Sequence, residues 1–282
     1  EEILASLRRR GMGSLCFFGP PGSGKTTLLP LYLAKEPWLR GKKILVLQPR
    51  RVAARSVATH MAYLLGEEVG QTVGYQVRME RRVSTTTAIE VITEGLLTRR
   101  LISDPELSGV GLIIFDEFHE RSVYSDTSLV LSHESLESLR PDLKLLVMSA
   151  TLGDNFSSPI FADAWRYSFS TAPHPLAIEY RAPEPRKSLW DAAAATVVEA
   201  ARLHDGDILA FLPGRYEIER TSETVRSRLE GFDVIELYGE QPLAEQAKAL
   251  RPNRSSARRV VISSPIAETS LTIEGVQIVV DT

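Results

Sequence analysis

The chain has 282 residues, of which 43% are apolar and 24% are charged, and its formal net charge is −3. Domains commonly have about 100–200 residues, so this length predicts two domains, each with enough apolar side chains for a core. The negative net charge excludes nucleic-acid binding through a global basic field, so any such binding must use local arginine clusters such as Arg50-Arg51.

Cys16 is the only cysteine of the sequence, which excludes an intrachain disulfide and a cysteine-based zinc site. It lies in an apolar run, so we expect a small buried core residue. No apolar run approaches the ~20 residues of a membrane span, and the N-terminus shows no secretory signal pattern. We therefore expect a soluble protein of a reducing compartment, the cytoplasm, without a membrane partner; import into an organelle stays open.

Short apolar runs alternate with helical stretches along the first 150 residues. Residues 2–10 are expected to form a short amphipathic helix. Six strands are predicted, at 14–18, 43–47, 72–77, 88–92, 111–115 and 144–148. Helices are predicted between several of them, notably at 51–65, 94–102 and 127–139. This alternation predicts an α/β domain with a parallel, doubly wound sheet.

The segment Gly19-Pro20-Pro21-Gly22-Ser23-Gly24-Lys25-Thr26 fits the phosphate-binding loop pattern G-x-x-x-x-G-K-[ST]. It lies between the first predicted strand and a helix predicted from Thr26 to Ala34, which is the context that the motif requires. Its glycines allow successive backbone N–H groups to point at a polyphosphate. We expect Lys25 to reach the β and γ phosphates and Thr26 to ligate Mg²⁺, with Thr27 also at the nucleotide. The alternative is a glycine-rich turn that binds nothing.

Asp116-Glu117-Phe118-His119 follows the apolar run 112–115, which has the pattern of a buried parallel strand. Open α/β sheets bind ligands at the carboxyl ends of their strands. Asp116 is expected to hold Mg²⁺ through water. Glu117, also a candidate metal ligand, is expected to orient and deprotonate the attacking water. The alternative is an ordinary solvated loop.

The second half of the chain begins with a proline-rich stretch, 171–187, which suggests a connector or an edge segment. We therefore predict domains at 1–170 and 171–282. Strands are predicted at 207–212, 233–237, 259–263 and 276–280, with helices at about 214–230 and 242–250. This plan is a second α/β domain without a phosphate loop. It ends directly after a strand, so we expect it to be incomplete.

Several further segments occur in the order typical of one family. They are Gln48-Pro49-Arg50-Arg51-Val52-Ala53-Ala54, Thr93-Glu94-Gly95-Leu96-Leu97, Asp116 to Ser122, Ser149-Ala150-Thr151, Phe211-Leu212-Pro213-Gly214 and Ala267 to Gly275. This ordered set resembles the DEAH-box RNA helicases of superfamily 2, and is most similar to the bacterial HrpB-type subgroup. The resemblance extends from about residue 14 to residue 282. It implies two RecA-like P-loop NTPase domains that use ATP and Mg²⁺.

The resemblance also implies roles for residues outside the phosphate loop. His119, Ser149 and Thr151 match segments that take part in hydrolysis and couple it to domain movement, and we expect the two hydroxyls to bond His119 or Asp116. Thr272 and Glu274 match positions that face the nucleotide. The residues that match contacts to the RNA backbone are Arg50, Arg51, Thr93, Gly95, Gly214 and Thr269. Such contacts predict sequence-independent, salt-sensitive binding of single-stranded RNA. Members often work with activating proteins.

Structural alternatives stay open for several of these residues. Arg50 and Arg51 could be a surface pair, and Thr93 could be a helix N-cap. The chain departs from the family pattern at Phe118, where alanine is usual, and at Ser264-Pro265, where Thr-Asn is common. The arginine-rich motif that follows in the family would lie beyond Thr282.

These points predict an ATP-dependent RNA helicase core that binds ATP and, without the arginine motif, turns it over weakly. Two other functions remain possible. One is a DNA translocase of the same superfamily, and the other is a nucleotide-binding scaffold without turnover.

Overall fold

The computed structural model describes residues 14–19, 24–150, 159–168, 175–182, 187–250, 257–267, 273 and 275–282. The chain divides into two compact units, Glu1–Pro173 and His174–Thr282, called unit 1 and unit 2 below. The helix predicted at 2–10 lies outside the described residues. In the part of the chain that is described, no helix combines the length and the apolar character needed to cross a membrane.

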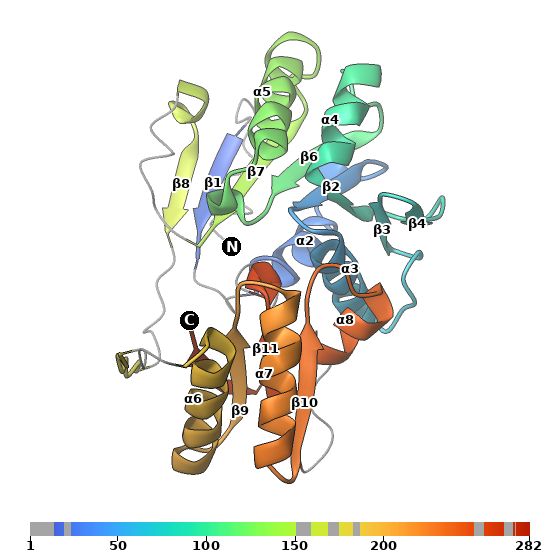
Figure 1. Ribbon diagram of the computed structural model, residues 1–282. Coiled ribbons are helices and arrows are strands. Elements are labelled where there is room, and N and C mark those ends of the chain that lie inside the picture. The colour runs from blue at the N-terminus through green and yellow to red at the C-terminus, as the bar shows by residue number, and fades with distance from the viewer. Residues whose placement is uncertain are drawn as a thin grey trace. The chain divides into compact units, whose positions relative to one another are not determined.

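Unit 1 is built on an eight-stranded sheet with the order β4-β3-β5-β2-β6-β7-β1-β8 (Figure 1). Its strands are β1 (Ser14–Phe18), β2 (Lys43–Gln48), β3 (Val73–Val77), β4 (Glu80–Arg82), β5 (Ile89–Thr93), β6 (Val110–Phe115), β7 (Lys144–Ser149) and β8 (Trp165–Ser168). Neighbouring strands are parallel throughout except for the antiparallel pair β3–β4. The carboxyl ends of seven strands therefore meet at one edge of the sheet.

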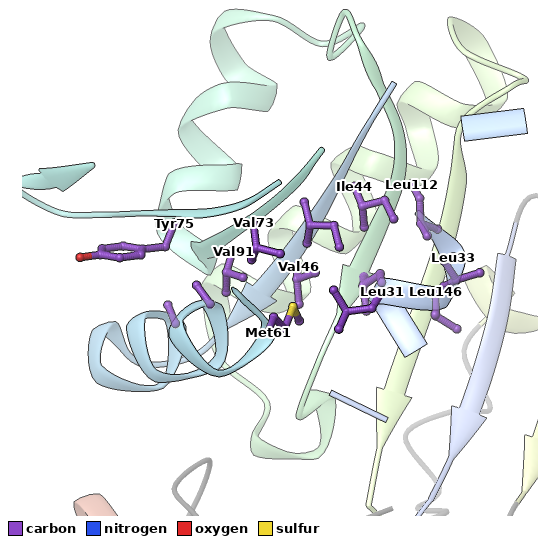
Figure 2. Close-up of a cluster of buried hydrophobic side chains, with 14 of the residues drawn as sticks. Leu31, Leu33, Ile44, Val46, Met61, Val73, Tyr75, Val91, Leu112 and Leu146 are labelled. Carbon is purple, nitrogen blue, oxygen red and sulfur yellow. The ribbon is translucent and has the colours of Figure 1, made fainter. Parts of the chain in front are cut away.

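Helices cover both faces of this sheet. They are α2 (Leu28–Leu33), α3 (Arg51–Leu65), α4 (Glu94–Ser103) and α5 (Val123–Ser138), with short 3₁₀ helices η1 (Pro37–Leu39), η2 (Phe118–Glu120) and η4 (Pro159–Phe161). Side chains alternate between the faces along each strand. Ile44 and Val46 pack with α2 and α3, whereas Leu45 and Leu47 pack with α4 and α5. Figure 2 shows the first of these two cores, where Met61 of α3 lies beside Val46.

The six strands predicted in unit 1 are all present, but β4 and β8 were not predicted. β4 carries Glu80, Arg81 and Arg82, whose charges hide it from a hydrophobic pattern, and it pairs only as the second arm of a hairpin with β3. The helix predicted from Thr26 to Ala34 is shorter, because a turn over residues 25–27 precedes it. α5 begins four residues earlier than predicted, because Ser122 caps it by accepting a hydrogen bond from the N–H of Ser125 (2.9 Å).

Unit 2 contains a four-stranded parallel sheet with the order β10-β11-β9-β12. Its strands are β9 (Asp207–Phe211), β10 (Phe232–Leu237), β11 (Arg258–Ser263) and β12 (Val276–Val280), and its helices are α6 (Leu189–Leu203), α7 (Arg215–Arg228), α8 (Leu243–Leu250) and the 3₁₀ helix η5 (Pro265–Ala267). α6 and α7 pack on the face of Ile208 and Ala210, and α8 packs on the face of Leu209. All four predicted strands are present.

α6 is the one long helix that the sequence prediction missed among the described residues. Its alanine-rich sequence has strong helix propensity, and Ser188 caps it by accepting a hydrogen bond from the N–H of Asp191 (3.3 Å). The prolines just before it led to the interpretation of a connector. The described residues of that stretch, 175–182 and 187, have no helix or strand, and α6 begins only after it.

A buried ion pair joins β9 to β11 in unit 2. The Nε of Arg259 lies 2.7 Å from Oδ2 of Asp207, and the backbone N–H of Arg259 donates to Oδ1 (2.8 Å). Both side chains are almost fully buried, with 3% and 8% exposed. Both oxygens of the Asp207 carboxylate therefore have hydrogen-bond donors inside the protein, as a buried charge requires.

Candidate active site at the carboxyl edge of the first sheet

The carboxyl ends of four neighbouring strands of unit 1 bring together polar residues from distant parts of the sequence. Gln48 ends β2, Asp116 follows β6, Ser149 ends β7 and Gly19 follows β1. The strands are neighbours in the order β2-β6-β7-β1, and the N–H of Gly19 donates to the carbonyl of Ser149 (3.1 Å). The predicted phosphate loop and the predicted acidic pair therefore lie at the same edge of one sheet.

The described part of the phosphate loop has the geometry that the motif requires. Gly24 has a φ of +78°, a backbone conformation that favours glycine, whereas the nearest atom to a Cβ there, Cδ1 of the exposed Leu28 at 2.8 Å, could move aside. Lys25 is buried, whereas Thr26 and Thr27 are half-buried. Thr27 stands at the N-cap position of α2 but makes no side-chain capping bond. Pro20, Pro21, Gly22 and Ser23 lie outside the described residues.

Asp116 is fully buried and held by donors from three segments. The Nε2 of Gln48 donates to Oδ2 (2.6 Å), and the backbone N–H of Glu117 donates to Oδ1 (3.0 Å). The Thr26 side chain also hydrogen-bonds to this carboxylate. Asp116 and Thr26, predicted as metal-holding residues from two separate motifs, are thus in direct contact.

Burial, together with the neighbouring Glu117 carboxyl, raises the pKa of Asp116 to about 6, while Thr26, Gln48 and Lys25 oppose the rise. Burial also raises the pKa of Glu117, against the opposing charge of Lys25. Nζ of Lys25 lies 3.6 Å from Oε1 of Glu117. A buried ammonium, the buried Asp116 carboxyl and the half-buried Glu117 carboxyl lie together here, an arrangement suited to bind a cation together with a polyphosphate.

The backbone after Asp116 is strained on both sides of η2. Glu117 has a φ of +50° and Arg121 has a φ of +45°, values that residues other than glycine rarely adopt. Such conformations cost about 1–3 kcal/mol each and persist where surrounding contacts enforce them. At Glu117 the strain accompanies a side chain directed at Lys25.

His119 links this turn to the end of β7. The backbone N–H of Ala150 donates to its Nδ1 (3.5 Å), and Oε2 of Glu117 lies 3.5 Å from the same nitrogen. Burial lowers the pKa of His119, which favours the neutral ring whose Nδ1 accepts the Ala150 N–H. The Ala150 backbone thus contacts His119, whereas the bonds predicted for the Ser149 and Thr151 hydroxyls stay predictions. Ser149 is buried beside it, and Thr151 lies outside the described residues.

Phe118, the departure from the family pattern, fills an apolar site. It is buried and packs edge-on against Phe115 and Phe161, with ring centroids 6.3 Å and 6.1 Å away. Its neighbours Glu117 and His119 still face Lys25 and Ala150. The larger side chain is accommodated without displacing either of them.

Arg50 and Arg51 lie next to the site, at the start of α3. Arg50 is the extended residue before the helix, and its Nη2 lies 4.0 Å from Oε2 of Glu120. Arg51 is exposed. Glu120 belongs to the family-like segment from Asp116 to Ser122, but the sequence analysis assigned it no role. This ion pair connects the first predicted RNA-contact segment to the turn that carries Glu117.

Thr93 and Gly95 lie at the start of α4. Thr93 holds the N-cap position, as the structural alternative expects, but its side chain makes no capping hydrogen bond. A Cβ at Gly95 would meet only the Tyr124 ring, at 3.8 Å, which is an ordinary contact. The adjacent Glu94 carboxylate accepts a hydrogen bond from Ser122, the N-cap of α5. Sequence reasoning missed this link, because only the fold brings α4 and α5 together.

The remaining candidates belong to unit 2. Gly214 is the N-cap residue of α7, with an extended backbone and a carbonyl that accepts from the N–H of Ile218 (3.1 Å). A Cβ there would lie 3.1 Å from the mobile end of the Glu217 side chain, so packing alone does not require glycine. Pro265 begins η5. Thr269, Thr272 and Glu274 lie outside the described residues.

No cluster of three or more His, Cys, Asp or Glu side chains able to hold a metal occurs among the residues with described positions. The oxygen donors of the site are the Thr26 hydroxyl and the Asp116 carboxylate, which hydrogen-bond to each other, and the carboxylate of the adjacent Glu117. Mg²⁺ is usually bound in this way, by one or two carboxylates together with waters and substrate phosphates. The donor set therefore fits Mg²⁺ carried by a nucleotide.

Comparisons with known proteins agree with this geometry. The family model "DEAD/DEAH box helicase" matches residues 3–158, and the model "Helicase conserved C-terminal domain" matches residues 192–282. The chain is 46% identical over 264 residues to the ATP-dependent RNA helicase HrpB of Escherichia coli (strain K12), an alignment that covers 93% of this chain and 32% of that protein.

Two crystal structures of the E. coli HrpB protein are similar to the whole chain. The one described as a DEAH/RHA helicase gives a TM-score of 0.91 at 43% identity, over 99% of this chain and 36% of that chain. The one described as a DExH-box NTPase gives a TM-score of 0.81 at 43% identity, over 99% and 34%. The chain thus spans about a third of the length of these relatives.

The comparisons confirm the predicted α/β fold class with RecA-like helicase domains. They also confirm the resemblance to the HrpB-type subgroup that the ordered motifs indicated. The first family model alone matches more than half of the sequence. The chain therefore belongs to the DEAD/DEAH box helicases.

Proposed function

We propose that this chain is the core of an ATP-dependent RNA helicase, in which hydrolysis of Mg-ATP drives movement along RNA or its unwinding. One observation carries the proposal: Lys25, Thr26, Asp116 and Glu117 converge within hydrogen-bond or ion-pair reach at the carboxyl edge of the first sheet. Phosphoryl transfer needs a phosphate cradle, a metal and a positioned nucleophile, and these four residues offer a place for each.

Each residue of the site has a role that follows from its position. Lys25 neutralises the β and γ phosphates, and its release from Glu117 accompanies their arrival. Glu117 then orients the attacking water and accepts its proton, for which a raised pKa is suitable. Neutral His119 holds the turn against the end of β7 through the Ala150 N–H. The donor set fits Mg²⁺, held by Thr26 and Asp116, which when bound neutralises charge on the phosphates.

The RNA-binding part of the proposal rests on Arg50, Arg51, Thr93 and Gly95 in unit 1, and on Gly214 and Thr269 in unit 2. Guanidinium groups make bidentate contacts with phosphates, and a bare glycine allows close approach of a sugar-phosphate backbone. Because such contacts read no bases, binding should fall with salt and depend little on sequence. Activating proteins, expected from the family resemblance, and weak turnover by the chain alone stay predictions.

The test compares nucleotide binding and turnover in the wild-type chain and in Glu117→Gln. Wild type should bind a fluorescent ATP analogue in the presence of Mg²⁺, and its hydrolysis should rise with single-stranded RNA. Glu117→Gln should retain ATP binding while losing turnover by about 10²–10⁴-fold, the usual contribution of a general base. Wild type that binds no nucleotide, or a variant that hydrolyses ATP normally, contradicts the proposal.

The same assay separates the two other candidate functions. Single-stranded DNA of equal length replaces RNA in a parallel series. Stronger stimulation by DNA identifies a DNA translocase. Nucleotide binding without turnover under any condition identifies a scaffold.

A further inference from the structure

Gln48 has no role in the proposed reaction, yet it donates a short hydrogen bond into the site. It is the last residue of β2 and is 1% exposed. Its Nε2 donates to Oδ2 of Asp116 at 2.6 Å. A polar side chain is costly to bury without a partner, and this one contacts the carboxylate proposed to hold the metal.

The sheet itself aims the two side chains at each other. Val46 pairs with Ile114, and Leu47 pairs with Phe115, so continuation of this register sets Gln48 opposite Asp116. Residues two apart share a face, and Val46 and Ile114 both belong to the core beneath α2 and α3. Gln48 and Asp116 therefore emerge on the face of α2, the helix that directly follows Lys25 and Thr26.

The direction of the hydrogen bond follows from the chemistry of the groups. An ionised carboxylate only accepts, so the amide nitrogen of Gln48 must face it. The Glu117 N–H holds Oδ1 and Gln48 holds Oδ2, which fixes the plane of the carboxyl group. The Thr26 side chain approaches the same carboxylate from the phosphate loop.

We infer that Gln48 is a positioning residue, whose amide holds the Asp116 carboxylate in the orientation required to bind Mg-nucleotide. The inference rests on the proposed function, because it assigns Asp116 to the metal. Partners of metal-holding carboxylates commonly contribute 10–100-fold to metal affinity or activity. Gln48 also directly precedes Pro49, Arg50 and Arg51 in the chain. The segment proposed to contact RNA and the partner of Asp116 are thus covalently adjacent.

The experiment measures how nucleotide binding depends on Mg²⁺ in the full 282-residue chain, with fluorescent ADP as the probe and no turnover involved. Gln48→Met keeps the approximate shape but cannot donate. It should raise the Mg²⁺ concentration for half-maximal ADP binding by about 10–100-fold. Binding of ADP in EDTA should stay unchanged, because the phosphate loop is untouched.

Gln48→Glu is the second variant, and it keeps the shape and polarity that favour folding. Above neutral pH the introduced carboxylate faces that of Asp116 and repels it. The Mg²⁺ requirement of Gln48→Glu should therefore exceed that of Gln48→Met. Val46→Ala is the matched control, since it lies on the same face of β2 without contacting Asp116. It should lower the melting temperature and leave the Mg²⁺ requirement unchanged.

The outcomes distinguish this inference from the proposed function. If wild type binds ADP and both Gln48 variants need the same Mg²⁺ concentration as wild type, the positioning role is wrong but the proposed function stands. If the Gln48 variants bind ADP more weakly by the same factor with Mg²⁺ and in EDTA, Gln48 has only a structural role, and the positioning role is again wrong. Wild type that binds no ADP under either condition overturns the proposed function itself.

Discussion

At the scale of single residues, the acidic pair makes stability depend on pH in an unusual direction. The pKa of Asp116 is about 6 in the folded chain, against about 4 for an unfolded carboxyl. The folded state therefore binds this proton more tightly, and the contribution of Asp116 to stability falls as pH rises from about 4 to about 6. In the chain without added nucleotide, Asp116→Asn should reduce the change of melting temperature with pH between about pH 4 and about pH 6. An unchanged slope contradicts the buried, desolvated carboxyl.

Cys16 gives a second prediction at this scale. Burial raises the pKa of its thiol to about 12, although the charge of Arg166 opposes the shift. Since the thiolate is the reactive form, this rise from an ordinary value near 8.5 lowers its reactivity on the order of 10³-fold. A thiol reagent should label the native chain that much more slowly than the urea-unfolded chain, with one thiol per chain. Rapid native labelling would show that β1 is exposed.

At the scale of elements, a substitution at Gly95 in α4 should affect stability and RNA binding differently. Its neighbour Tyr124 leaves room for a methyl group, and alanine is favoured over glycine within a helix by about 0.5–1 kcal/mol. Gly95→Ala should leave the melting temperature unchanged or raise it. If RNA passes close to this backbone, as proposed, the methyl group should weaken RNA binding, measured by fluorescence anisotropy. Unchanged RNA affinity contradicts the assignment of Gly95 to the RNA site.

The elements also show what can be read from the sequence. Buried parallel strands are continuous apolar runs, so β2, β6 and β7 were predicted within one or two residues. The site's two halves were predicted as well, because each motif follows such a strand. β4 and β8 lack apolar runs, and α6 was hidden behind prolines. Gln48, Glu120 and Ser122 lie in the quoted segments but were assigned no role, since their partners come from other strands and helices and only the fold brings them together.

At the scale of the whole molecule, the two units should respond separately to damage. Removing one partner of a buried ion pair costs about 3–5 kcal/mol, and Asp207 pairs with buried Arg259 inside unit 2. Asp207→Ala should lower the unfolding transition of unit 2 in a denaturant titration. ADP binding at Lys25 and Asp116 should persist at denaturant concentrations that unfold unit 2 of the variant. Simultaneous loss of both would show that the units unfold as one.

The central claim is that Mg-nucleotide binds at the carboxyl edge of the first sheet, between Lys25 and the Asp116–Glu117 pair. A crystal structure of the chain with ADP and Mg²⁺ tests it most directly. The account predicts a β-phosphate in contact with Nζ of Lys25, and a metal held by the Thr26 hydroxyl with Asp116 beside it, directly or through water. A nucleotide bound elsewhere, with Lys25 still paired to Glu117, would contradict it.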